Sequence, residues 1–480
     1  MIKLEFLAHR AALLAGQDNK LEVLLRVQGP AAPESHRDRL PLNLAIVIDR
    51  SGSMAGRAIA EAKRCAGMIV DRLSAKDCAG IVVYDDVVNV LVPSRPVEDK
   101  KLFHAALQEF HTGGTTALHA GWLAGAEQAA HQLNGPALSR VLLLSDGCAN
   151  HGLCDVTAIA KHCTEMANAG VGTSTYGLGT SFNEDLMTAM ASSGQGNAYY
   201  GRTADDLMDP FQQEFDLLDA LCARRLRLAL DPAMGVRVEV VNGYKTDVEG
   251  RSMLPDLAYG GEAWALLRLT VARSAVELAS DGDTHLLTAN LAYATLDDRT
   301  NYAEPVHLRL PRLPAAAFAT IAPNDLVTSR AAELSAAGLQ EQARSAALSG
   351  DWEQVQHLLQ ELRAEAAHSP WLHASIAELE RYANRRESQR FSKEALYKAS
   401  AMRSRLAALD EQEAWSRDLE AEKASFLRRK LEQGRRFEPT PGRKAPPPLP
   451  QGKPIHPQAR AKPSAPPPPP PRPSEDPSRS

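Results

Sequence analysis

The sequence predicts an α/β protein in which a doubly wound, mostly parallel sheet is inserted in a β-sandwich and followed by an α-helical region and a disordered tail. Three observations support this fold class. Over residues 41–216, near-continuous apolar runs alternate with helical patterns, as is typical of parallel strands buried on both faces. Strands of a different type flank this segment on both sides. The last part of the chain, residues 438–480, holds 17 of the 31 prolines.

The α/β segment alternates in a regular way. Its predicted strands are residues 42–48, 78–84, 87–92, 140–145, 171–176 and 198–200. Its predicted helices are residues 58–73, 100–110, 117–133, 155–168, 183–191 and 204–215. Strands that alternate with helices of this length predict a mostly parallel sheet with helices on both faces.

Apolar residues recur at every second position in the two flanking segments, residues 1–40 and residues 217–312. They are Leu21, Val23, Leu25 and Val27 in the first segment, and Val236, Val238 and Val240 in the second. This period is typical of half-buried strands. We therefore predict that the two segments form one antiparallel β-sandwich, into which the α/β domain is inserted.

Residues 323–437 have helical patterns and form a predicted α-helical arm. A helix start is indicated at Asn324 and a stop at Gly350, because Asn is a favoured N-cap and Gly a favoured C-terminal residue. A long charged helix is predicted over residues 387–433. We expect most of its surface to face solvent and a short apolar stripe to pack on the rest of the arm; pairing of this helix in a coiled coil is the alternative. Residues 438–480 form a predicted disordered Pro-rich tail, which serves as a tether or as a ligand of a proline-recognising module.

The composition excludes several classes of protein. The chain has 480 residues, 44% of them hydrophobic and 24% charged, and a formal net charge of −5, unlike the basic footprint of a nucleic-acid binder. No stretch approaches the roughly 18–20 apolar residues that span a bilayer, and the N-terminus lacks the apolar core of a signal peptide. Six cysteines do not form a disulfide framework and favour a reducing compartment. We therefore predict a cytoplasmic protein.

Polar residues follow two of the buried strands directly. Asp49 begins a D-x-S-x-S pattern with Ser51 and Ser53, and Asp146 follows the strand 140–145. Between them, Thr115 comes after two glycines in the loop before a helix. In an open parallel sheet, ligands bind at the carboxyl ends of the strands near the point where the strand order reverses. We therefore expect these five side chains to converge.

Their chemistry favours a divalent metal. Five hard oxygen ligands with few charges suit Mg²⁺, with Mn²⁺ as the alternative, because such ions prefer six oxygens and keep some waters. The predicted set is too small to enclose the ion, so one position stays open.

The D-x-S-x-S pattern, the Gly-Gly-Thr loop and the Asp-Gly pair at 146–147 resemble the metal-ion-dependent adhesion site of von Willebrand factor A-like domains, over roughly residues 42–215. The resemblance implies that Ser51, Ser53 and Thr115 contact the metal and that Asp49 and Asp146 act largely through water. It also implies that an Asp or Glu of a partner protein fills the open position. The wider layout resembles bacterial proteins with a flanking β-sandwich and, loosely, the inter-alpha-trypsin inhibitor heavy chains.

The predicted function is therefore that of an adaptor or scaffold that binds a partner carboxylate through the metal. We expect no enzyme, no nucleic-acid partner and no membrane partner, while the oligomeric state stays open. A metal-dependent hydrolase or phosphatase is one alternative. The phosphatase pattern requires a second Asp where Ser51 stands, and a hydrolytic serine requires a base that the nearby sequence lacks. A structural oligomer assembled through the helical arm is the other alternative.

Three further assignments have competing interpretations. Thr116 is the alternative to Thr115 as the threonine ligand. Asp85 and Asp86 form a polar hairpin turn, with a calcium site as the alternative. Several Cys and His residues gather shortly after Asp146, where a zinc site competes with ordinary packing. They are Cys148, His151, Cys154, His162 and Cys163.

Overall fold

The structure is a computed structural model, and its description covers most of the first 408 residues. The described residues are 1–31, 40–131, 137–146, 149–178, 182–201, 207, 211, 214, 215, 217, 218, 220–277, 282–366, 370–404 and 407–408.

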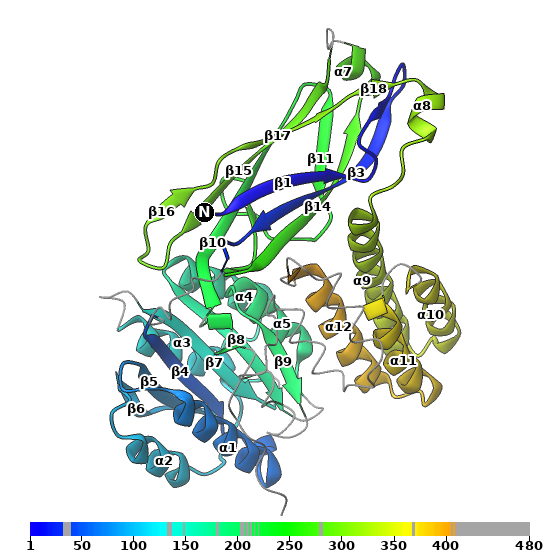
Figure 1. Ribbon diagram of the computed structural model, residues 1–480. Coiled ribbons are helices and arrows are strands. Elements are labelled where there is room, and N and C mark those ends of the chain that lie inside the picture. The colour runs from blue at the N-terminus through cyan, green and yellow to red at the C-terminus, as the bar shows by residue number, and fades with distance from the viewer. Residues whose placement is uncertain are drawn as a thin grey trace, which may run out of the picture. The chain divides into compact units, whose positions relative to one another are not determined.

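The α/β domain is built on a six-stranded sheet (Figure 1). Its strands are β4 (Leu42–Asp49), β5 (Cys78–Tyr84), β6 (Val88–Pro96), β7 (Leu138–Ser145), β8 (Val171–Leu178) and β9 (Ala198–Gly201). Its helices are the 3-10 turn η1 (Gly52–Met54), α1 (Arg57–Arg72), α2 (Lys100–Glu109), α3 (Leu118–Ala130), α4 (Val156–Asn168) and α5 (Glu184–Ser193). The strand order is β6-β5-β4-β7-β8-β9, in which β6 pairs antiparallel and the others pair parallel.

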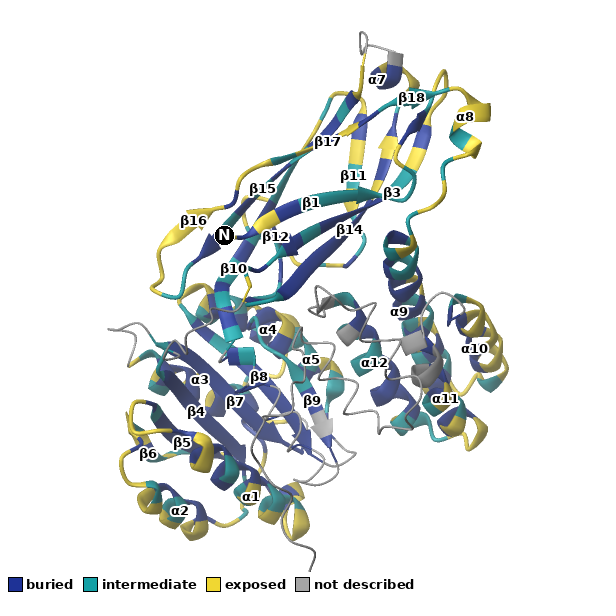
Figure 2. Cartoon of the chain, viewed as in Figure 1, coloured by how far each residue is buried: buried dark blue, intermediate teal, exposed yellow. Residues whose placement is uncertain are grey.

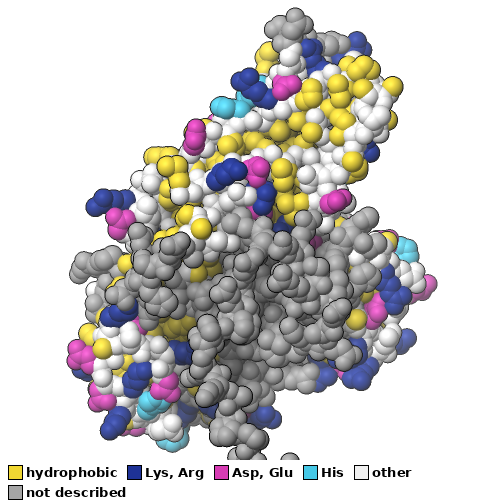
Figure 3. Space-filling model, in the orientation of Figure 1, with side chains coloured by type: hydrophobic (Ala, Val, Ile, Leu, Met, Phe, Trp, Pro, Cys, Tyr) yellow, Lys and Arg dark blue, Asp and Glu magenta, His cyan; other side chains and the backbone are white. Residues whose placement is uncertain are grey.

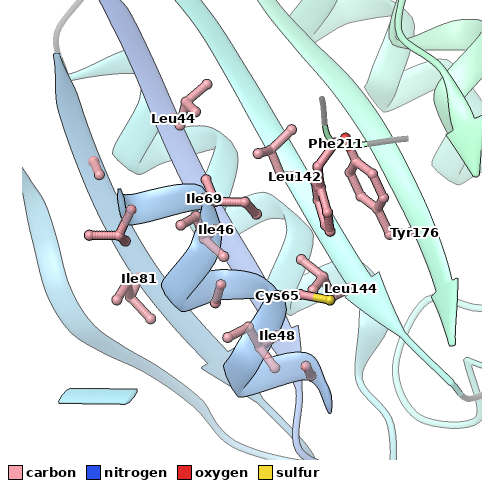
Figure 4. Packing of buried hydrophobic residues seen from close by; sticks show 14 of the residues in the cluster. Leu44, Ile46, Ile48, Cys65, Ile69, Ile81, Leu142, Leu144, Tyr176 and Phe211 are labelled. Carbon is pink, nitrogen blue, oxygen red and sulfur yellow. The ribbon is translucent and has the colours of Figure 1, made fainter. Parts of the chain in front are cut away.

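Helices cover both faces of this sheet, so the central strands are buried throughout (Figure 2). On one face, Ile46 and Ile48 of β4 pack with Cys65 and Ile69 of α1 (Figure 4). On the other face, alternate residues of the same strand pack against α3, α4 and α5. The doubly wound α/β class predicted from the apolar runs is confirmed.

The flanking segments form two antiparallel sheets. One sheet has the order β1-β3-β14-β11, and the other has the order β12-β10-β15-β16, with β13 on β10 and β17 on β15. The N-terminal strands are β1 (Lys3–Ala8), β2 (Leu13–Leu14) and β3 (Asn19–Gln28). The later strands are β10 (Leu221–Pro232), β11 (Val236–Val240), β12 (Ser252–Met253), β13 (Leu257–Ala258), β14 (Gly261–Val271), β15 (Thr284–Ala294), β16 (Thr300–Tyr302), β17 (Val306–Leu310) and β18 (Arg312–Leu313). Short helices α7 (Arg273–Glu277) and α8 (Ala315–Ala319) complete this part.

One strand pair explains why the α/β domain is an insertion. Strand β3 precedes the domain and β14 follows it, yet they pair antiparallel over their whole length, from Glu262 opposite Gln28 to Val271 opposite Asn19. Side chains of both sheets share one apolar core. The predicted sandwich with an inserted α/β domain is therefore confirmed.

In its described residues the helical arm contains four helices, α9 (Asp325–Ser349), α10 (Trp352–Ala366), α11 (Pro370–Asn384) and α12 (Ser388–Ser404). As predicted, Asn324 caps α9 by accepting a hydrogen bond from the Val327 amide, and Gly350 ends it at φ 80°, a conformation that glycine adopts without a steric penalty. The start of α9 packs through Val327 and Leu334 on Trp264 of the sandwich.

The predicted long helix over residues 387–433 is wrong in its extent. The described helix α12 ends at Ser404, and Ala407–Ala408 form a short strand, β19, that pairs with Gly261 and Glu262 of β14. Strand β11 covers only the other end of β14, from Leu267 to Val271. Strand β19 therefore pairs with backbone groups of β14 that β11 leaves uncovered, in keeping with the need of edge N–H and C=O groups for partners.

Other sequence predictions fall partly outside the described residues. The Pro-rich tail, 438–480, lies outside them, as do most of the predicted helix 204–215 and the end of the predicted long helix. The domain boundaries predicted above stay predictions. Among the described helices, none has the length and apolar composition that crossing a bilayer requires. On the face shown in Figure 3, basic and acidic side chains are intermingled, in keeping with the small net charge.

A glycine in α3 tests how closely this helix packs on the sheet. A Cβ atom at Gly121 would lie 2.3 Å from the Tyr84 ring. We expect Gly121→Ala to lower the free energy of unfolding by about 1–3 kcal/mol through overpacking, as measured by urea unfolding. The matched control is Gly338→Ala in α9, where a Cβ meets no atom within 4 Å; there the free energy should rise by up to about 1 kcal/mol through helix propensity. A rise in both variants would contradict this packing.

Candidate metal centre

The predicted site residues lie where the strand order of the α/β sheet reverses. The chain proceeds from β4 to β5 and β6 on one side, and then crosses to β7 on the other side of β4. Asp49 is the last residue of β4, and Asp146 directly follows β7. Because β4 and β7 are parallel neighbours, their carboxyl ends meet at the same edge, which is the usual place for ligands in such sheets.

Asp49 is held in a fixed position by its neighbours. Its side chain is fully buried. One carboxylate oxygen accepts a hydrogen bond from the Ser51 amide at 2.8 Å, and the other accepts one from the Ser145 hydroxyl at 2.7 Å. Burial raises the pKa of Asp49, while the hydrogen bonds from Ser145 and Ser51 act in the opposite direction. The two bonds fix the orientation of the carboxylate.

The other oxygen-bearing side chains form a continuous run. The Ser51 and Ser53 hydroxyls lie 3.0 Å apart, and the Ser53 hydroxyl donates to an Asp146 carboxylate oxygen at 2.9 Å. Burial raises the pKa of Asp146 to about 6; the Ser53 hydrogen bond lowers it, and the Asp49 charge raises it. Ser53 is exposed, so the run opens to solvent at its centre.

The Gly-Gly-Thr loop is bonded to the D-x-S-x-S loop through the backbone. The Gly113 amide donates to the Arg50 carbonyl at 2.8 Å, and the Gly52 amide donates to the Gly114 carbonyl at 3.1 Å. These bonds place Thr115 beside the serine loop. No side-chain bond from Thr115 to the serines or aspartates is recorded among the described residues.

The two candidate threonines differ in their surroundings. Thr115 is exposed, whereas Thr116 is buried and its amide donates to the Asn150 side chain at 2.8 Å. The accessible hydroxyl therefore belongs to Thr115, which favours it over Thr116 as the metal ligand. The assignment of all five ligands stays a prediction.

Asp85 is a site residue that sequence reasoning missed. It lies in the predicted hairpin turn between β5 and β6, but its side chain is buried and accepts hydrogen bonds from the Arg50 guanidinium at 3.1 Å and the Val87 amide at 2.8 Å. A Cβ atom at Gly113 would lie 2.4 Å from the Asp85 carboxylate, so this loop requires glycine. A signal was present, because Asp85 directly follows buried strand β5, as Asp49 ends β4.

The histidine and cysteine alternative gains no support from the described residues. Among them, no group of three or more His, Cys, Asp or Glu side chains is placed to hold a metal ion. His162 faces His119 across α3 and α4, with 2.9 Å between their ring nitrogens. Cys163 is buried, and burial raises the pKa of its thiol to about 12. Cys148 lies outside the described residues.

The described contacts pair no histidine with the two serines. The hydroxyls of Ser51 and Ser53 bond each other and Asp146, while His119 is paired with His162. The histidine base of a serine hydrolase is thus not among the described contacts of these hydroxyls.

The donor set fits a small hard cation. Two carboxylates and two hydroxyls are already brought together, and a third hydroxyl lies on the adjoining loop. All are oxygens, which Mg²⁺ and Mn²⁺ prefer. Two acidic groups at one partly buried place repel each other, and a cation between them relieves that repulsion. A set with so few protein ligands leaves room for water or for an external carboxylate.

Comparison with known proteins identifies the family of the α/β domain. Residues 43–213 match the family model of the von Willebrand factor type A domain. The chain therefore contains a domain of this family, and the antiparallel sheets of the sandwich flank it.

Among curated proteins, it is 28% identical over 217 residues to the uncharacterised protein sll0103 of Synechocystis, covering 45% of this chain and 51% of the relative. It is 24% identical over 257 residues to the human inter-alpha-trypsin inhibitor heavy chain H3, covering 46% of this chain and 28% of the relative. The chain thus spans about half or less of the length of these relatives.

The fold similarity extends beyond the α/β domain. The structure of a von Willebrand factor type A protein from Catenulispora acidiphila matches with a TM-score of 0.62 at 15% identity, covering 78% of this chain and 88% of that chain. This coverage is well above the share of the chain that the family model matches. At this identity the match concerns the fold alone.

The Asp85 carboxylate provides a test of what holds the site loops together. Burial acts to raise its pKa, but hydrogen bonds from the Val87 amide and Arg50 outweigh this and lower it. A carboxyl with a lowered pKa in the folded state adds stability above its unfolded pKa of about 4, and this stability is lost as the pH falls through the folded value. We expect Asp85→Asn to lower the free energy of unfolding by about 1–3 kcal/mol at pH 7.

The difference in the free energy of unfolding between Asp85→Asn and wild type should become smaller below about pH 4. Urea unfolding at pH 7 and pH 3 measures this difference. The control is Asp86→Asn, an exposed neighbour, for which we expect a change within about 0.5 kcal/mol. An Asp85→Asn effect that is the same at both pH values would argue against a role for the charge.

Proposed function

We propose that this protein is a metal-dependent adaptor that binds a carboxylate of a partner protein through Mg²⁺, or Mn²⁺, held by Asp49, Ser51, Ser53, Thr115 and Asp146. The family match supports the coarser statement that the chain carries a von Willebrand factor type A domain, a module that often mediates protein interaction. The bound ion would supply an electrophilic point for an Asp or Glu side chain of the partner.

One observation carries the proposal. The hydroxyls of Ser51 and Ser53 and the Asp146 carboxylate form an unbroken run at 3.0 and 2.9 Å, with the exposed Ser53 at its centre. Hard oxygens from two loops therefore converge at a place that solvent reaches. A partner side chain approaches such an ion from outside, because the protein side is already filled by Asp49 and its hydrogen-bond donors.

The buried Asp49 suits an electrostatic role behind the ion. Both of its carboxylate oxygens accept hydrogen bonds from Ser51 and Ser145, which leaves it oriented but set back from the surface. It would act on the metal largely through water, and the seryl hydroxyls would contact the ion. The hydroxyls that contact the ion would be neutral, which leaves the ion electrophilic toward an external carboxylate.

Metal binding can be measured directly. We expect titration calorimetry of the full chain with Mg²⁺ to show one site, and Asp49→Ala or Ser53→Ala to weaken this binding by about tenfold or more. The control is Asp71→Ala, which removes an exposed carboxylate that bonds His104 on α2; its Mg²⁺ affinity should equal that of wild type. A wild-type chain that takes up neither Mg²⁺ nor Mn²⁺ would rule the metal centre out.

Partner capture tests the adaptor role. Wild-type chain and the double variant Asp49→Ala/Ser51→Ala should be used to capture proteins from native lysate, each with Mg²⁺ or with EDTA. We expect at least one protein to be retained only by wild type with Mg²⁺, because a metal bridge needs both the ligands and the ion. Reconstitution with that purified protein should then reproduce the Mg²⁺ dependence. Equal recovery under all four conditions would contradict metal-bridged binding.

A further inference from the structure

The helical arm contacts the α/β domain through a buried lysine. Lys393 of α12 has a side chain that is 4% exposed, and its ammonium lies 2.8 Å from the Glu184 carboxylate in the first turn of α5. It also donates to the Phe182 carbonyl at 2.7 Å and lies 3.7 Å from the centre of the Phe182 ring. One ammonium therefore satisfies a charge, a carbonyl and an aromatic face of the neighbouring domain.

Other arm residues reinforce this contact. The Ser392 hydroxyl donates to Glu184 at 3.0 Å, and Arg344 of α9 bonds Asp185 at 2.7 Å. The Tyr397 ring meets the Phe182 ring edge-on at 6.4 Å. Two helices of the arm thus hold the segment that begins α5.

Phe182 transmits the position of the arm to the end of a sheet strand. Its ring lies directly over Gly177 of β8, so closely that a Cβ atom there would be 2.5 Å from the ring. Gly177 is the register partner of Ser145 at the end of β7, and Ser145 donates to Asp49. Packed side chains and paired strands therefore connect Lys393 to the metal centre without a gap.

We propose that Lys393 is a positioning residue of the metal centre. By holding Phe182 on Gly177, it fixes the end of β8, and through the β7–β8 pairing it fixes the Ser145 hydroxyl that orients Asp49. The inference rests on the proposed function, because it concerns the affinity of the same site. Since the arm and the ion act on one element, docking of the arm and binding of the ion must favour each other to the same extent.

The test compares two lysines of the same helix. Lys393→Met removes the contact to the α/β domain. Lys398→Met is the matched control, because Lys398 pairs within the arm, with Glu378 of α11 at 2.9 Å and Glu394 at 3.7 Å. Mg²⁺ affinity of the full chain is measured by calorimetry for wild type and both variants. We expect Lys393→Met to weaken Mg²⁺ binding by at least about fivefold and Lys398→Met to leave it within about twofold.

A second measurement reads the coupling in the opposite direction. Hydrogen exchange of wild type with Mg²⁺ and with EDTA should show that the ion slows exchange in α12 and at the start of α5. The same comparison in Lys393→Met should lose this Mg²⁺ dependence, whereas Lys398→Met should keep it. If Lys393 only stabilised the fold, Lys393→Met would change the exchange rates by the same factor with Mg²⁺ and with EDTA. That result would overturn the positioning role.

The outcomes separate the two proposals. Mg²⁺ binding in wild type with unchanged affinity in Lys393→Met would overturn the positioning role and leave the metal centre intact. A wild type that does not bind Mg²⁺ would overturn both. Should Lys393→Met fail to fold because the half-buried Glu184 loses one of its two cations, Lys393 and Arg344, the double variant Lys393→Met/Glu184→Gln takes its place. Its Mg²⁺ affinity is judged by the same fivefold threshold.

Discussion

The burial of the Asp49 carboxylate is the constraint on which the rest of the site depends. A desolvated charge at the end of a strand needs hydrogen-bond donors, because an unpaired one costs several kcal/mol. The Ser51 amide and the Ser145 hydroxyl provide them, and each comes from a different loop or strand. To satisfy Asp49, the D-x-S-x-S loop must turn back on β4, and the end of β7 must lie beside it. The convergence of Ser53 and Asp146 follows from that arrangement.

The same requirement extends to the third loop. Arg50 belongs to the D-x-S-x-S loop. Its guanidinium donates to the Asp85 carboxylate, and its carbonyl accepts from the Gly113 amide. The two glycines allow the backbone to pass close to Asp85 and Asp86. Three chain segments distant in sequence are thereby bonded into one surface, and the exposed hydroxyls of Ser53 and Thr115 lie on it.

The architecture outside the α/β domain gives this surface a defined setting. Pairing of β3 with β14 closes the sandwich around the two ends of the inserted domain. The arm then returns, with Val327 and Leu334 packed on Trp264 at one end and Lys393 buried against Phe182 at the other. A buried ion pair is a costly way to gain stability. The ion pair between Lys393 and Glu184 is more readily explained by a need to hold the arm in one fixed position on the α/β domain.

Local residue chemistry by itself determined much of this protein. The apolar runs identified the central strands, because burial on both faces leaves no place for polar residues. The Asn324 cap and the Gly350 stop bounded α9, because both act within one helical turn. The D-x-S-x-S, Gly-Gly-Thr and Asp146 segments indicated which side chains meet, since parallel strands end at a common edge.

Contacts between distant segments were decided only by the tertiary structure. The place of Asp85 directly after a buried strand was the one local signal. Its contacts with Arg50 and Gly113 could not be predicted, because both residues come from other loops. Ala407 and Ala408 pair with the β14 edge, which lies some 140 residues earlier in the chain, so the local helical pattern could not predict a strand there. Lys393 reads as one more basic residue on a charged helix. Its burial against Phe182 and Glu184 arises only when the arm folds back, because desolvation and pairing are properties of an assembled surface and not of a local pattern.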